Sequence, residues 1–193
     1  MKKGILFLIL MLTAILFIGC SDDGGAEADI DPTEIPEYIT IQGERYDTSL
    51  TELILSEANL TNDDIEPIKY MVNLTILNLY NNQISDASVL KGLTNLTALN
   101  LSANQISDIS TLAELTNLTI LSLREAQISD ISALAELTNL HELFLQDNQI
   151  NDISVLKGLT NLTQVILLDN PITAGQIAEL REALPNTDIY ADY

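Results

Sequence analysis

Cysteine, histidine and basic side chains are scarce in this sequence. It contains one cysteine, Cys20, and one histidine, His141, so neither has a second Cys or His with which to form a metal site. Nucleophile-elbow, glycine-rich phosphate-loop and zinc-ligand spacings are absent as well. We therefore expect no metal, no cofactor and no enzymatic activity.

The shortage of basic residues leaves the chain strongly acidic. Eight Lys and Arg side chains stand against 28 Asp and Glu, and the formal net charge is -20. Such a surface repels nucleic-acid phosphates and anionic lipid headgroups. We therefore expect neither nucleic-acid binding nor electrostatic attachment to a membrane. The hydrophobic content of 47% and the length of 193 residues suit one ordered domain.

The N-terminal stretch MKKGILFLILMLTAILFIGC has the pattern of a secretory signal. Two lysines precede an apolar run from Gly4 to Gly19. The ending FIGC resembles the bacterial lipobox, which precedes a lipidated cysteine. The resemblance implies a signal peptide at residues 1–19, acylation of Cys20, for example with palmitate, and a position on the extracytoplasmic side of a bacterial cell membrane. The alternative is an uncleaved signal anchor, which tethers the chain on the same side.

Residues 20–36 are rich in acid, Gly and Pro and have little to bury. We expect them to form a flexible linker with a span of roughly 20 Å. The domain that follows, residues 37–193, would then lie close to the membrane.

A repeat of 22 residues fills most of this domain. Full copies begin at Leu74, Leu96, Leu118 and Leu140, a last one begins at Leu162, and a copy two residues longer begins at Leu50. Positions 1, 4, 6, 11, 14, 17 and 20 of each copy are apolar with few exceptions. The first half alternates like a strand, and the second half, with apolar residues three apart, predicts a short 3₁₀ or irregular return. One copy is too small for a core, so the copies must stack.

This pattern resembles the internalin-like class of leucine-rich repeats. The resemblance implies an α/β solenoid, a curved right-handed stack with parallel strands on the concave face and 3₁₀ or irregular segments on the convex face. It also implies a role in binding a protein partner. We expect a monomer with six repeats at residues 50–171. An N-terminal strand cap would occupy residues 37–49, and a C-terminal cap with an amphipathic helix and a strand around Ile189 would occupy residues 172–193.

Two polar positions of the repeat have structural interpretations. We expect the asparagines at position 9 to bond backbone groups of their own and adjacent coils: Asn82, Asn104, Asn148 and Asn170. Ala58 and Ala126 interrupt this ladder, at a cost on the order of 1 kcal/mol each. The aspartates at position 13 either cap the helical turn that follows or form a calcium ladder, and we favour capping: Asp64, Asp86, Asp108, Asp130 and Asp152.

The concave face is where the repeats differ, since positions 3, 5, 7 and 8 are not fixed by stacking. The large side chains there are the candidate partner-binding residues: Tyr80, Arg124, Phe144, Gln146, Ile166 and Leu168. Alternatively, Arg124 pairs locally with Glu125 or Glu142, and the C-terminal cap covers Ile166 and Leu168.

These features predict a membrane-anchored, extracytoplasmic protein-binding module. We favour a partner within the cell envelope, because the domain and its tether are short. The alternatives are a lipoprotein that binds cell-wall glycan or another carbohydrate, and an adhesin for a host receptor.

Replacement of the lipobox cysteine tests the predicted anchor. Cys20→Ser removes the thiol that would be acylated, so we expect complete loss of labelling by an alkyne analogue of palmitate in bacterial cells. Ser21→Ala, one residue further on, is the matched control and should leave the labelling intact. Labelling that persists in Cys20→Ser would contradict the prediction.

Overall fold

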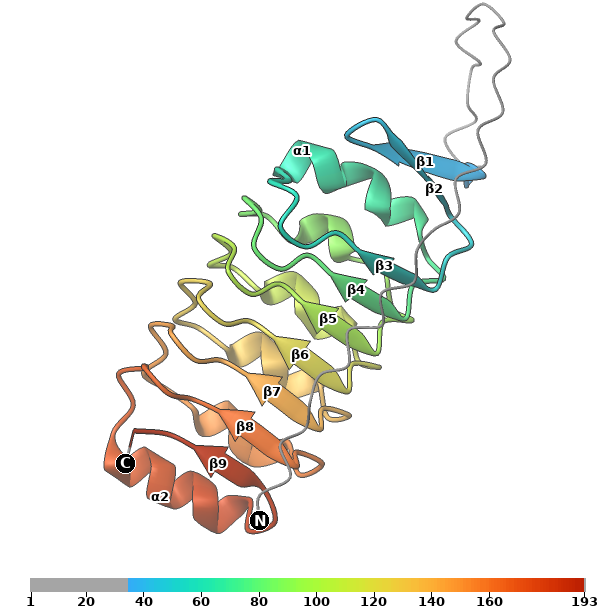
Figure 1. The fold of residues 1–193 in the computed structure, drawn as a ribbon. Coiled ribbons are helices and arrows are strands. Elements are labelled where there is room, and N and C mark those ends of the chain that lie inside the picture. The colour runs from blue at the N-terminus through green and yellow to red at the C-terminus, as the bar shows by residue number, and fades with distance from the viewer. Residues whose placement is uncertain (1–34, 193) are drawn as a thin grey trace, which may run out of the picture. The chain divides into compact units, whose positions relative to one another are not determined.

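The computed structural model describes residues 35–192, which form a stack of coils (Figure 1). Cys20, the predicted signal peptide and most of the predicted linker lie outside the described residues. Among residues 35–192, none of the helices has the length and hydropathy of a membrane span.

A parallel sheet of seven short strands lines one side of the stack. Its strands are β3 (Glu52–Ile54), β4 (Ile76–Asn78), β5 (Ala98–Asn100), β6 (Ile120–Ser122), β7 (Glu142–Phe144), β8 (Gln164–Ile166) and β9 (Asp188–Tyr190), in sequence order. The middle residue of β3 to β8 is a buried Leu or Val, and its two neighbours point outward. The predicted period of two is thus confirmed, because a strand turns alternate side chains to opposite faces.

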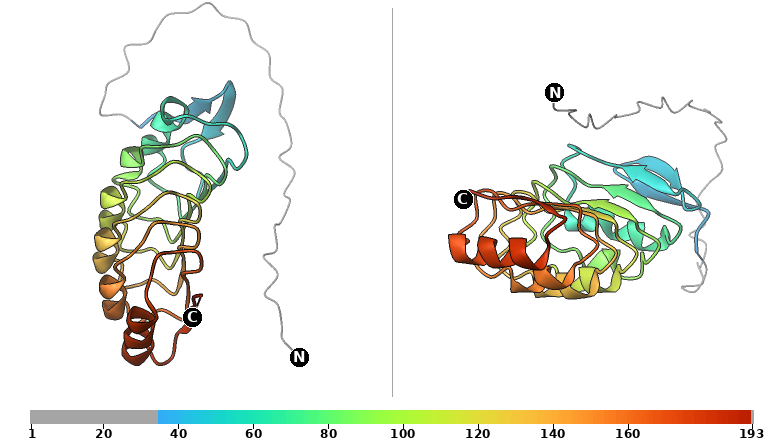
Figure 2. Two further views of the ribbon diagram at one scale, coloured as in Figure 1. Left: turned by 90° about the vertical axis from the view of Figure 1, so that its left-hand side faces the viewer. Right: turned by 90° about the horizontal axis from the view of Figure 1, so that it is seen from below.

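Short helical turns return the chain along the opposite side (Figure 2). They are α1 (Asn62–Ile65), η1 (Glu66–Tyr70), η2 (Ser88–Leu90), η3 (Ser110–Glu114), η4 (Ser132–Glu136) and η5 (Ser154–Gly158), all but α1 being 3₁₀ helices. The first copy alone has an α-helical turn, at the place where it is two residues longer. Leucines and isoleucines from both halves of every coil meet in one continuous core between the sheet and the turns.

Both ends of the core are capped. At the N-terminal end, β1 (Tyr38–Ile41) and β2 (Glu44–Asp47) form an antiparallel hairpin that buries Ile39 and Ile41. At the C-terminal end, α2 (Ala174–Ala183) begins with a capping box at Thr173 and buries Ile177 and Leu180. The strand expected around Ile189 is β9, which adds to the sheet beside β8.

The asparagines at position 9 bond as predicted. In Asn82, Nδ2 donates to the carbonyls of Leu79 in its own coil and Leu55 in the preceding coil, at 3.0 and 2.8 Å. Oδ1 accepts from the amide of Leu60 in the preceding coil at 2.9 Å. One buried side chain therefore satisfies backbone groups of two coils, and Asn104, Asn148 and Asn170 repeat the arrangement.

The coils that lack this asparagine have a different turn. Gln127, after Ala126, and Asn59, after Ala58, have left-handed φ values of 64° and 55°, unlike the residues that follow the four asparagines. The amides of Ala126 and Ile128 then converge on Oδ1 of Asn148, at 3.2 and 2.9 Å. A left-handed residue between two amides turns both N–H groups toward the same acceptor, an arrangement called a nest.

The junction between the third coil, which begins at Leu96, and the fourth, which begins at Leu118, therefore has the fewest hydrogen bonds of the asparagine ladder. Ile84, Ile128 and Ile150 each donate their amide to an asparagine of the next coil. Ile106 is the exception within residues 35–192, because the next coil has Ala126 at that place. The bond that Gln105 donates to the Ile84 carbonyl also has no counterpart at Gln127.

We expect the Ile106 amide to exchange with deuterium faster than the equivalent amides of Ile84, Ile128 and Ile150. A missing bond of about 1 kcal/mol corresponds to a roughly fivefold difference. Amide exchange followed by NMR measures this directly. Ala126→Asn should slow the exchange at Ile106 and raise the free energy of unfolding by about 1 kcal/mol. Equal rates at all four isoleucines in the unmodified chain would contradict this account.

Candidate functional site

The outward side of the seven-stranded sheet, called here the sheet face, carries the residues that differ between coils. Its side chains come from positions 3 and 5 of each strand and from positions 7 and 8 just after it. Neighbouring strands are about 4.8 Å apart, so equivalent side chains form rows that cross the strands.

Large side chains lie on the sheet face in two places. At β3 and β4, Ile54 and Ile76 are 50% and 37% exposed. A larger group lies at β7, β8 and β9. The register aligns Phe144 with Ile166 and Ile166 with Tyr190, so position 5 forms a row of three large side chains. Phe144 and Ile166 are half-buried, and Tyr190 is 47% exposed. Leu168, at position 7 of the last repeat, is 37% exposed beside this row. We call Phe144, Ile166, Leu168 and Tyr190 the apolar patch.

The structure decides between the two alternatives for Leu168 and adds one residue to the sheet face. Leu168 is exposed and not covered by the C-terminal cap, because the strand of the cap extends the sheet. Tyr190 was missed as a face residue, because it lies outside the repeats and its strand was interpreted only as a cap. The alternation in DIY, the three residues of β9, was the available signal, since it turns Tyr190 to the same side as Asp188.

Gln146 lies beside the apolar patch at position 7 of its coil. Its Oε1 is the one buried side-chain N or O atom among the described residues that has no hydrogen-bond partner. An unpaired buried polar atom costs on the order of 1–3 kcal/mol, and such atoms are rare in native structures.

Arg124 is the predicted basic residue of the sheet face, and the structure pairs it locally. Its guanidinium lies 3.5 Å from the carboxylate of Glu125, with the two side chains 45% and 53% exposed. An ion pair this exposed contributes little to stability. The backbone amide of Arg124 donates to Oγ of Ser102 at 3.1 Å, and that oxygen also lies 2.7 Å from Oγ of Ser122.

The middle of the sheet face is small and polar. Asn78 and Asn100 use Oδ1 to accept the amides of Tyr80 and Ser102, so their polar groups are engaged within their own coils. Tyr80 is half-buried and stands apart from the apolar patch. The predicted partner-binding residues therefore share one face but are not evenly distributed, and four of the six lie between β7 and the turn after β8.

Position 8 has a left-handed backbone in all six repeats. The residues and φ values are Glu57 (59°), Asn81 (53°), Ala103 (55°), Glu125 (53°), Asp147 (59°) and Asp169 (55°). Asp and Asn tolerate this conformation better than other non-glycine residues. The backbone therefore favours short polar side chains along this edge of the sheet face, and two of them are the aspartates beside the apolar patch.

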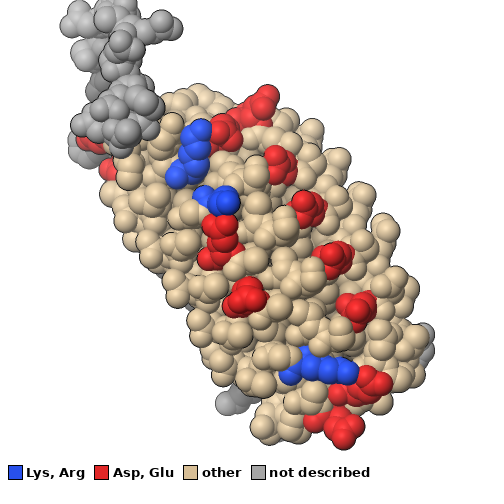
Figure 3. Space-filling model, turned by 180° about the vertical axis from the view of Figure 1, so that it is seen from behind, with Lys and Arg blue, Asp and Glu red and all other residues tan. Residues whose placement is uncertain are grey.

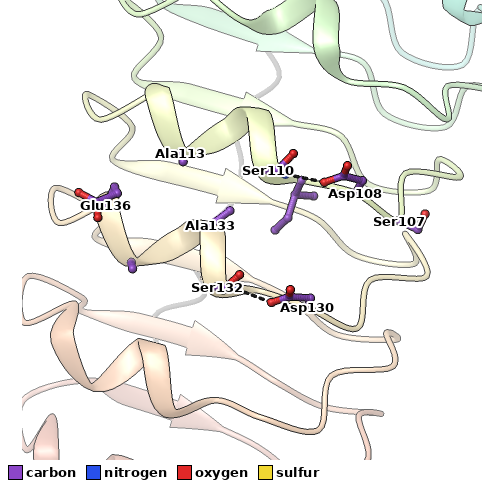
Figure 4. A pocket seen from close by; sticks show the side chains of 10 residues that line it. Ser107, Asp108, Ser110, Ala113, Asp130, Ser132, Ala133 and Glu136 are labelled. Carbon is purple, nitrogen blue, oxygen red and sulfur yellow. Dashed lines mark hydrogen bonds between the residues drawn. The ribbon is translucent and has the colours of Figure 1, made fainter.

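The aspartates at position 13 are caps, as predicted. Oδ1 of Asp108 and of Asp130 each accepts the backbone amide of the serine two residues later at 2.8 Å, and Asp86 and Asp152 repeat this contact (Figure 4). In the two-residue-longer coil, Asp64 completes a capping box with Thr61. Within residues 35–192, no group of three or more His, Cys, Asp or Glu side chains is arranged to hold a metal ion.

The side opposite the sheet face, which carries the helical turns and is called here the convex side, has a shallow hollow. The hollow lies between η3 and η4 and is lined by Ala113, Ala133 and the capping residues Asp108 and Asp130, among others (Figure 4). Acidic side chains run in files along this side, with the few basic ones among them (Figure 3). All three lysines of residues 35–192 are paired, Lys69 with Glu66, Lys91 with Glu114 at 3.1 Å and Lys157 with Glu179 at 2.7 Å.

His141 replaces a recurring threonine in a ladder on the surface. Thr75 and Thr97 donate their hydroxyls to the carbonyl of the equivalent residue in the preceding coil, at 3.0 Å each. His141 is exposed, and its Nδ1 lies 2.8 Å from the carbonyl of Asn139. It is a surface substitution, as the sequence indicated.

Comparisons with known families agree with the geometry of the coils. The leucine rich repeat family matches residues 48–106, and the form with two copies of the repeat matches residues 94–136 and 138–182. These ranges cover more than half of the chain. Leucine-rich-repeat domains are generally protein-binding modules and generally lack catalytic activity. No curated protein matches the chain by sequence.

Solved structures include similar proteins from two bacteria. An internalin of Listeria monocytogenes is 29% identical over 77% of this chain and 51% of its own, with a TM-score of 0.59. Internalin C2 of the same organism is 30% identical over 78% of this chain and 79% of its own, with a TM-score of 0.59. A leucine-rich-repeat protein of Leptospira interrogans is 28% identical over 74% of this chain, with a TM-score of 0.64. The chain spans about half of the first internalin and 37% of the Leptospira protein.

The capping aspartates give stability a specific dependence on pH. The amide of Ser132 and then its hydroxyl lower the pKa of Asp130 from its ordinary value, and Asp108 and Asp152 have the same cause of lowering. A carboxylate with a lowered pKa stabilises the fold above the pKa of the unfolded chain, and this contribution is lost as pH falls through the folded pKa. The affected window therefore lies below about pH 4.

We expect Asp130→Ala to lower the thermal midpoint at pH 7, and we expect this effect to shrink as the pH falls below about 4, because the carboxylate is then progressively protonated. Glu136→Ala is the control, because the structure shows no hydrogen bond or ion pair of this side chain among residues 35–192. Thermal unfolding followed by circular dichroism gives both midpoints. An Asp130→Ala effect that is independent of pH would show that the cap does not act through its charge.

Proposed function

The chain belongs to the leucine-rich-repeat family, and we propose that it binds a protein partner with its sheet face while lipid-anchored on the outer side of a bacterial cell membrane. The apolar patch is the centre of the proposed binding surface. Tyr80, Arg124 and Gln146 extend that surface toward the middle of the sheet.

The exposure of large side chains at β8 and β9 carries the proposal. Leu168 and Tyr190 expose 37% and 47% of their surface next to Phe144 and Ile166, although the same chain buries every leucine of its core. Contiguous apolar and aromatic surface is the usual centre of a protein interface, since its burial supplies most of the binding free energy. The open surface of a sheet suits a macromolecule better than a small ligand.

The tether supports a location for this activity. The sequence MKKGILFLILMLTAILFIGC ends in a lipobox-like FIGC, so Cys20 would hold the lipid. With only residues 21–34 between the lipid and the described domain, the sheet face would stay within a few tens of ångströms of the membrane. A partner inside the cell envelope fits this reach better than a distant host receptor.

Photocrosslinking in cells tests the proposed face. A photoreactive amino acid at position 124 leaves the apolar patch intact and should capture a specific protein. We expect Leu168→Ser and Tyr190→Ala each to reduce the yield of that product about tenfold, as for interface anchors, with little change in thermal midpoint.

Ile35→Ser is the matched control, because Ile35 is 54% exposed and lies outside the seven-stranded sheet. It should leave the yield unchanged. Capture that is unaffected by Leu168→Ser and Tyr190→Ala would remove the apolar patch from the proposed surface. Binding of purified cell-wall glycan that depends on Tyr80 and Phe144 would instead favour a carbohydrate ligand.

A further inference from the structure

Carboxylates border the apolar patch on both sides. On the side of position 3, Glu142 of β7 and Asp188 of β9 point outward from the sheet. On the side of position 8, Asp147 and Asp169 follow β7 and β8 in the left-handed turns. The patch is therefore an apolar strip between two acidic edges.

These four carboxylates have no cation of their own. Among residues 35–192, Arg124 is the one basic residue on the sheet face, and Glu125 already pairs with it. None of the four carboxylates has an ion pair or an accepting hydrogen bond within the described part of the chain. The acids of the convex side differ, because serine amides bond several of the aspartates and lysines pair with three of the glutamates.

The dimensions of the strip suit one polypeptide segment. Positions 3 and 8 are five residues apart, which is at most roughly 16 Å because the chain leaves the strand after position 5, and the strands from β7 to β9 span about 10 Å. A helix with its side chains is about 10–12 Å wide. A segment lying on the apolar row could therefore reach both acidic edges with Lys or Arg side chains.

We infer that the apolar patch binds a basic amphipathic segment of the partner protein, with apolar side chains on Phe144, Ile166, Leu168 and Tyr190 and with Lys or Arg at the flanking carboxylates. The inference rests on the proposed function and adds the chemistry of the partner. An acidic segment is repelled by both edges. A neutral apolar segment leaves four carboxylates partly desolvated without a counter-charge, which costs binding free energy.

A series of peptides tests this charge requirement on the full-length chain. Three peptides of about 15 residues share one pattern of leucines on a helical face and carry Lys, Gln or Glu at every other position. A fourth retains the lysines and has serine in place of leucine. Fluorescence anisotropy at low and at physiological salt gives each affinity. The Lys/Leu peptide should bind at least about tenfold more tightly than the others, and its affinity should fall as salt rises.

The chain offers closely matched variants for this experiment. Asp147→Asn with Asp169→Asn removes two charges, and Asn tolerates the left-handed backbone at both positions, so the fold should be unchanged. We expect the double variant to bind the Lys/Leu peptide about tenfold more weakly and with a smaller salt dependence. Glu136→Gln with Glu114→Gln removes two charges from the convex side and should change the affinity less than twofold.

The outcomes separate this inference from the proposed function. If both double variants weaken binding equally, the peptide recognises only the net charge of the chain, and the inference is wrong. If the Gln or Glu peptide binds best and its affinity depends on Leu168 and Tyr190, the patch is a protein-binding surface but not one for a basic segment. If the protein captured from position 124 contacts the patch through a segment without Lys or Arg, the same conclusion holds.

Discussion

The stacking of one coil on the next depends on a buried asparagine amide at position 9. After each strand the chain must turn away from the sheet, which leaves carbonyls and amides inside the molecule with no strand to pair with. The asparagine of one coil bonds such groups in its own coil and in the preceding one, as Asn82 does with Leu79, Leu55 and Leu60. Buried backbone groups without partners are costly, so this side chain fixes both the turn and the distance between coils. In the coils that have the asparagine, it therefore also helps to place the outward residues of the sheet face.

The two coils without the asparagine show how local the constraint is. With Ala126 in place, the next coil still supplies Asn148, and its single oxygen now accepts two amides because Gln127 becomes left-handed. The fourth coil is thereby well bonded to the fifth but less so to the third. A solenoid tolerates this, since each coil depends only on its neighbours and a deficit at one junction does not spread through the stack.

The features that repeat from coil to coil could be predicted from the sequence, whereas the features that occur only once could not be settled from it. The spacing of leucines, the asparagine ladder, the capping aspartates and the terminal caps all follow from patterns that repeat, where each copy supports the interpretation of the others. The left-handed Gln127 was not anticipated. The pairing of Arg124 with Glu125 and the exposure of Leu168 were each one of the alternatives that the sequence left open, because each depends on a single contact. Tyr190 is the clearest case, because its role depends on how β9 docks on β8, and residues 172–193 have no second copy from which to infer that.

The two sides of the molecule differ in how far their polar residues serve the fold. On the convex side the acidic residues mostly serve the fold, as helix caps and as partners of lysines. On the sheet face positions 3, 5, 7 and 8 lie outside the core. Some of these residues bond the backbone, as Asn78, Asn100 and Ser102 do, and position 8 demands a residue that tolerates a left-handed backbone. Asp147 and Asp169 meet that demand and also place negative charge beside the apolar patch. The same two residues therefore satisfy the backbone of the turn and set the charge of the surface. Because asparagine also tolerates a left-handed backbone, replacing both aspartates with asparagine removes the charge without disturbing the coil.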